Sequence, residues 1–112
     1  MKNKPLENEQ QLQDIINAKG ISIIFKHNTT CPISKMTKTE LEENASILPD
    51  EAPIYFLNLL RHRDISDEIA SQFSVIHESP QVLLIKDGEC VYDASLYDIT
   101  AEELANAIQN TV

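Results

Sequence analysis

The sequence has few cysteines, few basic residues and no long hydrophobic run. With only 2 cysteines in 112 residues, the disulfide framework of many small secreted domains is not expected. Lys and Arg total 9 against 18 Asp and Glu, a net charge of -9. Nucleic acid is therefore not an expected partner, because phosphate binding needs clusters of Lys and Arg. No apolar stretch follows the charged N-terminus, so we expect neither a signal peptide nor a membrane span, no membrane partner, and a cytoplasmic location.

The composition also limits metal binding and domain number. The cysteines and histidines show none of the paired spacings of zinc sites, so we expect no metal and no bound cofactor. An apolar fraction of 42% argues against disorder. The length suits one domain, residues 1–112, with one hydrophobic core.

The apolar pattern alternates between helical and strand periods. Helical spacing predicts helices over 6–19, 32–48, 65–73 and from a capping box at Thr100 onward. Short apolar runs predict strands over 21–25, 53–60, 81–86 and 89–93. Asp64 suits the N-cap of the third helix, and Met36 belongs to the predicted inward stripe of the second. Asp87-Gly88 predicts a hairpin between the last two strands.

This order of elements predicts an α/β fold. A strand, a helix and a second strand in succession imply a right-handed parallel crossover, and the hairpin adds an antiparallel pair. We expect a four-stranded mixed sheet flanked by helices, with an extra N-terminal helix. Cys31 at the first strand-to-helix turn, and Pro80 just before the third strand, are typical of a thioredoxin-like fold.

Cys31 has the setting of a reactive cysteine rather than a buried structural one. It follows a polar turn and opens a helix, where free N–H groups and the helix dipole favour a thiolate. Pro32 suits the first helical position, where its missing N–H costs nothing. The cations Lys26, His27 and Lys35 are close in sequence and would stabilise a thiolate.

Ser34 stands where a Cys-X-X-Cys motif has its second cysteine. Because serine cannot resolve a mixed disulfide, a partner bound to Cys31 must be released by an outside thiol. Ser34 either holds the Cys31 sulfur, through its hydroxyl or its backbone N–H, or only caps the first helical turn. A bridge between Cys31 and Cys90 is neither supported nor excluded by the sequence, although half-buried strand packing is the favoured role of Cys90.

Four further features stand near the predicted site. We expect a cis peptide bond before Pro80, with the backbone of Ser79 offered to the substrate as a short strand-like pairing. His27 is interpreted as a polar strand end rather than the base of a Cys–His pair, since no orienting Asp or Asn is evident. His77 is a weaker candidate that approaches from the other side. The basic cluster 61–63 suits either an anionic ligand or a solvated loop.

Thr30-Cys31-Pro32-Ile33-Ser34, preceded by Phe25-Lys26-His27 and followed by the 77–80 stretch His-Glu-Ser-Pro, resembles the monothiol bacilliredoxin family of the YtxJ type. The resemblance covers nearly the whole chain. It implies that the substrates are S-bacillithiolated client proteins and that bacillithiol is a co-substrate. It further implies that Cys31 attacks the bacillithiol sulfur and carries bacillithiol until another thiol removes it. We expect Lys35, Lys38 or the basic cluster 61–63 to receive the malate carboxylates of bacillithiol.

Other classes remain open at this point. Monothiol glutaredoxins share the Cys-X-X-Ser pattern, and some bind an iron–sulfur cluster, but their usual Cys-Gly-Phe-Ser differs from the sequence here. A peroxiredoxin expects Thr three residues before its cysteine, where this chain has Asn28. A module that binds a small thiol without redox turnover is the third alternative.

Overall fold

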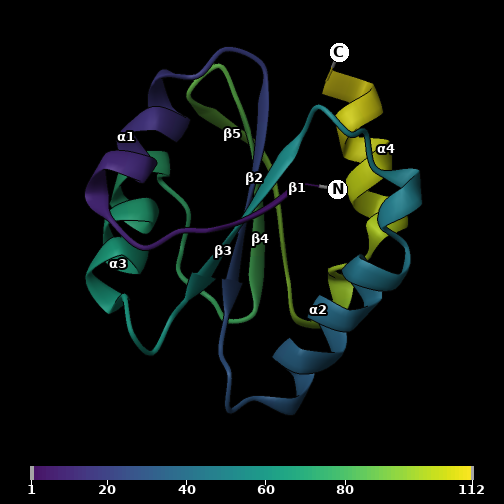
Figure 1. Ribbon diagram of the computed structural model, residues 1–112, viewed down its shortest axis with the longest axis horizontal. Helices are drawn as coiled ribbons and strands as arrows, with labels where there is room; N and C mark the ends of the chain where they lie inside the picture. Colours follow the sequence, from purple (N-terminus) through teal and green to yellow (C-terminus); the bar gives the residue numbers. More distant parts are fainter. Residues whose placement is uncertain (1, 112) are drawn as a thin grey trace.

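The computed structural model describes residues 2–111, which form a five-stranded sheet with helices on both faces (Figure 1). The strands are β1 (Lys2–Pro5), β2 (Ile21–His27), β3 (Pro53–Asn58), β4 (Gln81–Lys86) and β5 (Glu89–Ser95). The helices are α1 (Glu9–Asn17), α2 (Pro32–Glu43), α3 (Arg63–Phe73) and α4 (Ala101–Thr111), with short 3-10 turns η1 (Ala45–Ile47) and η2 (Leu96–Asp98). Within residues 2–111, no helix is both long and apolar enough to cross a membrane.

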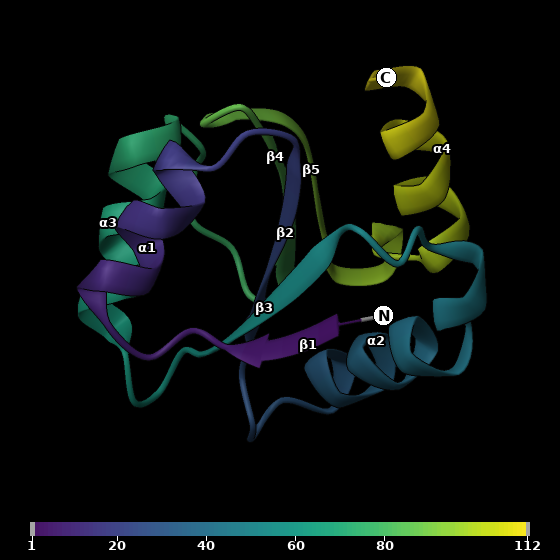
Figure 2. The ribbon, with the colours of Figure 1, turned by 45° about the horizontal axis from the view of Figure 1, so that its top comes forward.

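The central strand β2 lies between a parallel and an antiparallel neighbour. The strand order is β1-β3-β2-β4-β5, with β2 parallel to β3 and antiparallel to β4. Helices α1 and α3 cover one face of the sheet, and α2 and α4 cover the other (Figures 1 and 2). Alternate β2 side chains enter separate cores: Ile23 and Phe25 pack with α2 and α4, whereas Ile24 packs with α1 and α3. Both faces of β2 are therefore buried, as its near-continuous apolar run predicts.

The α/β class is confirmed, but the expected number of four strands is wrong. β1 precedes the predicted N-terminal helix in the chain and pairs in parallel with β3 at the edge of the sheet. Its sequence, Lys-Asn-Lys-Pro, carries no apolar signal. An edge strand is held through backbone hydrogen bonds and tolerates polar side chains and proline, so apolar periodicity could not find it.

Two details of the helices also differ from expectation. Met36 is 50% exposed, and α2 instead buries Ser34, Thr37 and Leu41. The buried stripe of α2 thus includes two polar residues, Ser34 and Thr37, which a pattern of apolar residues cannot reveal. Helix α3 takes His62 as its N-cap, so Asp64 lies in the first turn, where a carboxylate still suits the helix dipole.

The predicted hairpin forms and is tied to the start of β2. Asp87 and Gly88 have positive φ values of 51° and 84°, typical of a type I′ turn. Gly20 donates its N–H to Asp87 Oδ1 at 2.7 Å, and its carbonyl accepts from the Asp87 N–H at 3.0 Å. A Cβ atom on Gly88 would lie 2.6 Å from the carbonyl oxygen of Ile16, so the turn packs directly on the end of α1.

Gly88→Ala should therefore destabilise the fold more than Gly20→Ala. Both glycines have positive φ, but a Cβ on Gly20 meets nothing within 4 Å. We expect Gly20→Ala to lower the free energy of unfolding by about 1 kcal/mol and Gly88→Ala by about 3 kcal/mol, because a backbone clash adds to the strain. Urea denaturation measures both, and equal losses would contradict this packing.

Candidate functional site

Cys31 lies at the N-cap of α2, directly after the carboxyl end of β2. The 28–31 turn is closed by the Cys31 N–H, which donates to the Asn28 carbonyl at 3.1 Å. Thr30 donates its N–H and its hydroxyl to Asn28 Oδ1 at 3.0 and 2.8 Å. Pro32 occupies the first turn of α2. Cys31 is a free, partly buried cysteine at a position where the orphan N–H groups of a helix favour negative charge.

Ser34 takes neither of its two expected roles. Its hydroxyl is fully buried, lies 2.6 Å from His27 Nδ1 and accepts from the Asn28 N–H at 2.9 Å. Burial, then the positive charge of Lys38, lowers the pKa of His27, so its ring is neutral at pH 7. At this distance the hydroxyl either donates to Nδ1 or accepts from it, according to the tautomer of the ring. Ser34 thus joins α2 to the end of β2, which agrees with the interpretation of His27 as a polar strand end.

Lys26 and His77 meet on the opposite face of the sheet. Lys26 is 0% exposed, and its Nζ lies 3.1 Å from His77 Nδ1 and donates to the Ser66 carbonyl at 3.1 Å. Burial lowers the pKa of Lys26 to about 8, and burial also lowers the pKa of His77. The expectation that Lys26 serves as a cation beside Cys31 is wrong, because strand alternation turns its side chain towards α3. The sequence signal for the burial of Lys26 is its position at the end of an otherwise apolar strand.

The peptide bond between Ser79 and Pro80 is cis, as expected. Gln81, the next residue, pairs with Lys26 in the β2–β4 ladder, which places the Ser79-Pro80 segment beside the carboxyl end of β2. The Pro80 carbonyl accepts from the Leu96 N–H at 3.1 Å. The Ser79 hydroxyl oxygen is buried and has no hydrogen-bond partner within residues 2–111. The start of α2, which carries Cys31, and the start of β4, which follows Pro80, therefore lie at the same end of the sheet (Figure 1).

Cys90 lies at the other end of the sheet. It pairs with Ile85, which pairs with Ser22 near the start of β2. The distance along the strand from Ser22 to His27 is roughly 16 Å at about 3.3 Å per residue, and Cys31 lies beyond His27. Since a disulfide needs Cα atoms within about 7 Å, Cys90 cannot bridge to Cys31 within one chain. Burial raises the pKa of Cys90, as suits a packed strand residue.

Basic side chains lie on α2 and on the turn after β3, at the end of the sheet where Cys31 lies. Lys35 is exposed on α2, whereas Lys38 is paired with Glu42 at 2.9 Å. The turn that carries the exposed Arg61 is fixed to β2, because the Leu59 N–H donates to the His27 carbonyl at 2.9 Å.

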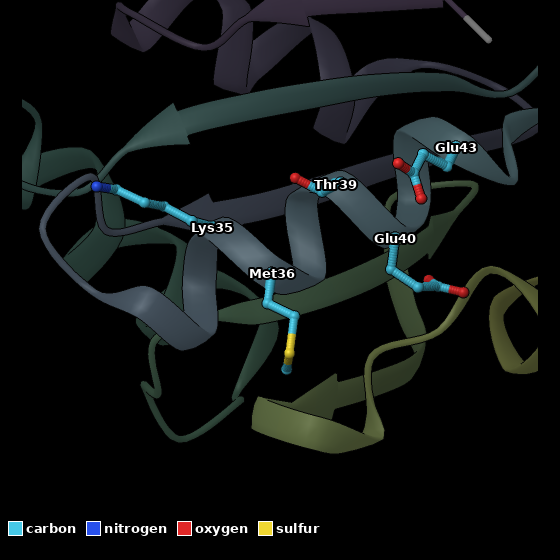
Figure 3. A pocket seen from close by; sticks show the side chains of 5 residues that line it. All are labelled: Lys35, Met36, Thr39, Glu40 and Glu43. Atoms are coloured by element: carbon cyan, nitrogen blue, oxygen red, sulfur yellow. The ribbon is translucent and has the colours of Figure 1, made fainter.

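An open groove runs along α2 beside this site. Its lining contains one predicted site residue, Lys35, and not Cys31; the lining residues are Lys35, Met36, Thr39, Glu40 and Glu43 (Figure 3). Lys35 points away from Met36 and Glu40 in this view. Cys31 therefore lies outside this groove. The described residues contain no group of three or more His, Cys, Asp or Glu side chains that could hold a metal ion.

Comparison with known proteins agrees with this geometry. The family model of monothiol bacilliredoxin BrxC matches residues 4–104. A solved structure described as a candidate oxidoreductase with a thioredoxin fold is 30% identical, with a TM-score of 0.84 over 94% of this chain and 92% of that one. Thioredoxin from Malassezia sympodialis is 18% identical, with a TM-score of 0.76 over 98% and 90% of the two chains. Mitochondrial thioredoxin 3 from Saccharomyces cerevisiae is 20% identical, with a TM-score of 0.75 over 96% and 93%. The fold is therefore thioredoxin-like.

The buried bridge at Ser34 predicts a stability effect that an exposed control lacks. Ser34→Ala leaves His27 Nδ1 and the Asn28 N–H without their partner, so we expect the free energy of unfolding to fall by about 1–3 kcal/mol. Thr39→Ala, at an exposed position of the same helix, should change it by less than about 0.5 kcal/mol. Chemical denaturation at pH 7 compares the two. Equal stability of the two variants would mean that the bridge contributes nothing.

Proposed function

This chain belongs to the monothiol bacilliredoxin family and has a thioredoxin-like fold, and we propose that it is a thiol–disulfide oxidoreductase that removes bacillithiol from S-bacillithiolated client proteins. The supporting observation is that Cys31 is a free, partly buried thiol at a helix N-terminus and that Cys90, the other free thiol, is too far away to reach it. Ser34 occupies the position of a resolving cysteine, and Cys90 lies at the far end of the sheet.

The proposed reaction is one thiol–disulfide exchange followed by a second. The Cys31 thiolate attacks the bacillithiol sulfur of the client's mixed disulfide, and the bond between that sulfur and the client sulfur breaks. The client leaves as a thiolate and takes a proton from water, while Cys31 keeps bacillithiol as a mixed disulfide. Because Ser34 has no sulfur, an outside thiol then attacks the same bacillithiol sulfur and releases Cys31. Bacillithiol is thus a co-substrate rather than a resident cofactor.

The surroundings of Cys31 suit both halves of such a substrate. We expect the backbone of Ser79, next to the cis bond, to pair with an extended client segment. The exposed cations Lys35 and Arg61 would attract the carboxylates of bacillithiol. We place this activity in the reducing cytoplasm, where a lone thiol stays free.

Cys31→Ala should abolish bacillithiol transfer, and Cys90→Ala should not affect it. The test is an intact-mass time course with a bacillithiolated client. We expect wild type and Cys90→Ala to gain one bacillithiol mass at rates within about twofold, because Cys90 lies remote from the reacting sulfur.

Three other outcomes would change the proposed function or its mechanism. Loss of transfer in Cys90→Ala would point to a route through two cysteines. Reaction with a glutathionylated client alone would replace the substrate. Absence of reaction with either client, together with an iron–sulfur absorption band, would favour a cluster carrier.

Lys35→Gln should slow transfer from the bacillithiolated client by about threefold at low salt, since one exposed cation near an anionic substrate contributes modestly. Lys19→Gln is the control, because Lys19 is equally exposed but precedes β2 at the other end of the sheet. Stopped-flow rates at low and high salt measure the effect, which high salt should remove. A loss that persists at high salt would show that Lys35 does not act through its charge.

A further inference from the structure

Two buried polar side chains stand opposite each other at the end of the β2–β4 ladder. Lys26 and Gln81 are 0% and 1% exposed, and they are direct partners in the antiparallel register. Directly opposed residues of an antiparallel pair project from the same face of a sheet. Both side chains therefore lie on the α1/α3 face, behind the sheet as seen from Cys31.

Both side chains reach the segment that leads to Ser79. Gln81 Nε2 donates to the Ile76 carbonyl at 2.9 Å, and Gln81 Oε1 accepts from the Glu78 N–H at 3.4 Å. Lys26 Nζ lies 3.1 Å from Nδ1 of the intervening residue, His77. Three consecutive residues are thus held by one cross-strand pair.

The hydrogen-bonding chemistry fixes the state of His77. A lysine ammonium has only donors, so His77 Nδ1 must accept and the ring proton must lie on Nε2. The same Nδ1 lies 3.3 Å from the fully buried Ser66 hydroxyl, and Lys26 also donates to the Ser66 carbonyl. Lys26 therefore joins β2, α3 and the 76–78 segment.

Packing alone would not hold this segment. It contains no helix or strand, and the Ile76 side chain is 87% exposed. Burial of a lysine is costly unless its hydrogen bonds compensate, so an apolar residue would serve better if β2 needed only packing here. Ile24, the previous residue on this face, is apolar.

We propose that Lys26 and Gln81 are positioning residues that hold the 76–78 segment so that the backbone of Ser79 is presented to a protein client. This inference rests on the proposed thiol exchange at Cys31. A client engages Ser79 by strand-like pairing, whereas a small disulfide needs only the thiol. Lys26 and Gln81 therefore affect the rate with protein substrates and not the reactivity of the Cys31 sulfur.

The test compares two substrates on the same enzyme. The rate constant for a bacillithiolated client protein is divided by that for 5,5′-dithiobis(2-nitrobenzoate), a small disulfide. The thiolate fraction of Cys31 and the folded fraction of the protein cancel in this ratio. We expect Lys26→Met and Gln81→Leu to lower the ratio by about tenfold, because misplacing a binding group costs rate only where that group is used. Ser22→Ala, a buried polar position on the same face of β2, is the control and should keep the wild-type ratio.

The pH dependence of the ratio separates positioning from general instability. Lys26 is acted on by Asp67 of α3 and contacts His77, which in turn is acted on by Arg63 and Asp67 of α3 and by Glu78 of its own loop. With its pKa lowered to about 8, Lys26 loses its charge as the pH rises through that value, and its hydrogen bonds weaken. The wild-type ratio should fall through about pH 8, and the Lys26→Met ratio should be flat. If Lys26→Met does not fold, Gln81→Leu carries the comparison.

An unchanged ratio in a folded Lys26→Met or Gln81→Leu variant would overturn the inference. If wild type does not accept bacillithiol at all, the proposed function fails on its own. The same ratio, measured with a client that carries another small thiol, then still decides whether the pair positions the Ser79 segment.

Discussion

The alternation of side chains along β2 is the constraint on which the rest of this structure depends. Because both faces of this central strand are buried, consecutive residues enter different cores and meet different helices. At its carboxyl end the same alternation continues with polar residues: Lys26 turns towards α3, and His27 turns towards α2. One strand end thereby fixes the helix that starts at Cys31 on one face and the segment that precedes Pro80 on the other.

The serine at position 34 has a structural as well as a chemical consequence. Its hydroxyl replaces the second thiol of a dithiol motif and has two hydrogen-bond partners, since it accepts from the Asn28 N–H and lies 2.6 Å from His27 Nδ1. A buried hydroxyl would lose both of these hydrogen bonds if it turned towards the Cys31 sulfur, so it keeps its position. In the proposed reaction, release of a partner from Cys31 therefore depends on a thiol from outside the protein.

Charge is distributed unevenly relative to this site. The chain carries a net charge of -9, which repels anionic substrates at long range, yet Lys35 and the turn of Arg61 stand where β2 and β3 end. Exposed charges are screened by salt within about 10 Å, so local cations act on a substrate mainly once it is close. A protein client and a small anionic thiol would meet this local surface rather than the average charge.

The sequence by itself determined the thioredoxin-like class and the position of Cys31 at a helix start, because apolar periods and capping residues act locally. It favoured a cis bond before Pro80, which the structure then established. It did not reveal β1, since the edge strand Lys2–Pro5 is held by backbone hydrogen bonds that no side-chain pattern records. It left Cys90 open, and only the strand register showed that this thiol lies at the opposite end of the sheet. It also grouped Lys26 with Cys31 because they are near in sequence, whereas the pleat of β2 placed the lysine against His77. Local structure follows from neighbouring residues, but partners across a sheet are chosen by register and pleat, which only the folded chain defines.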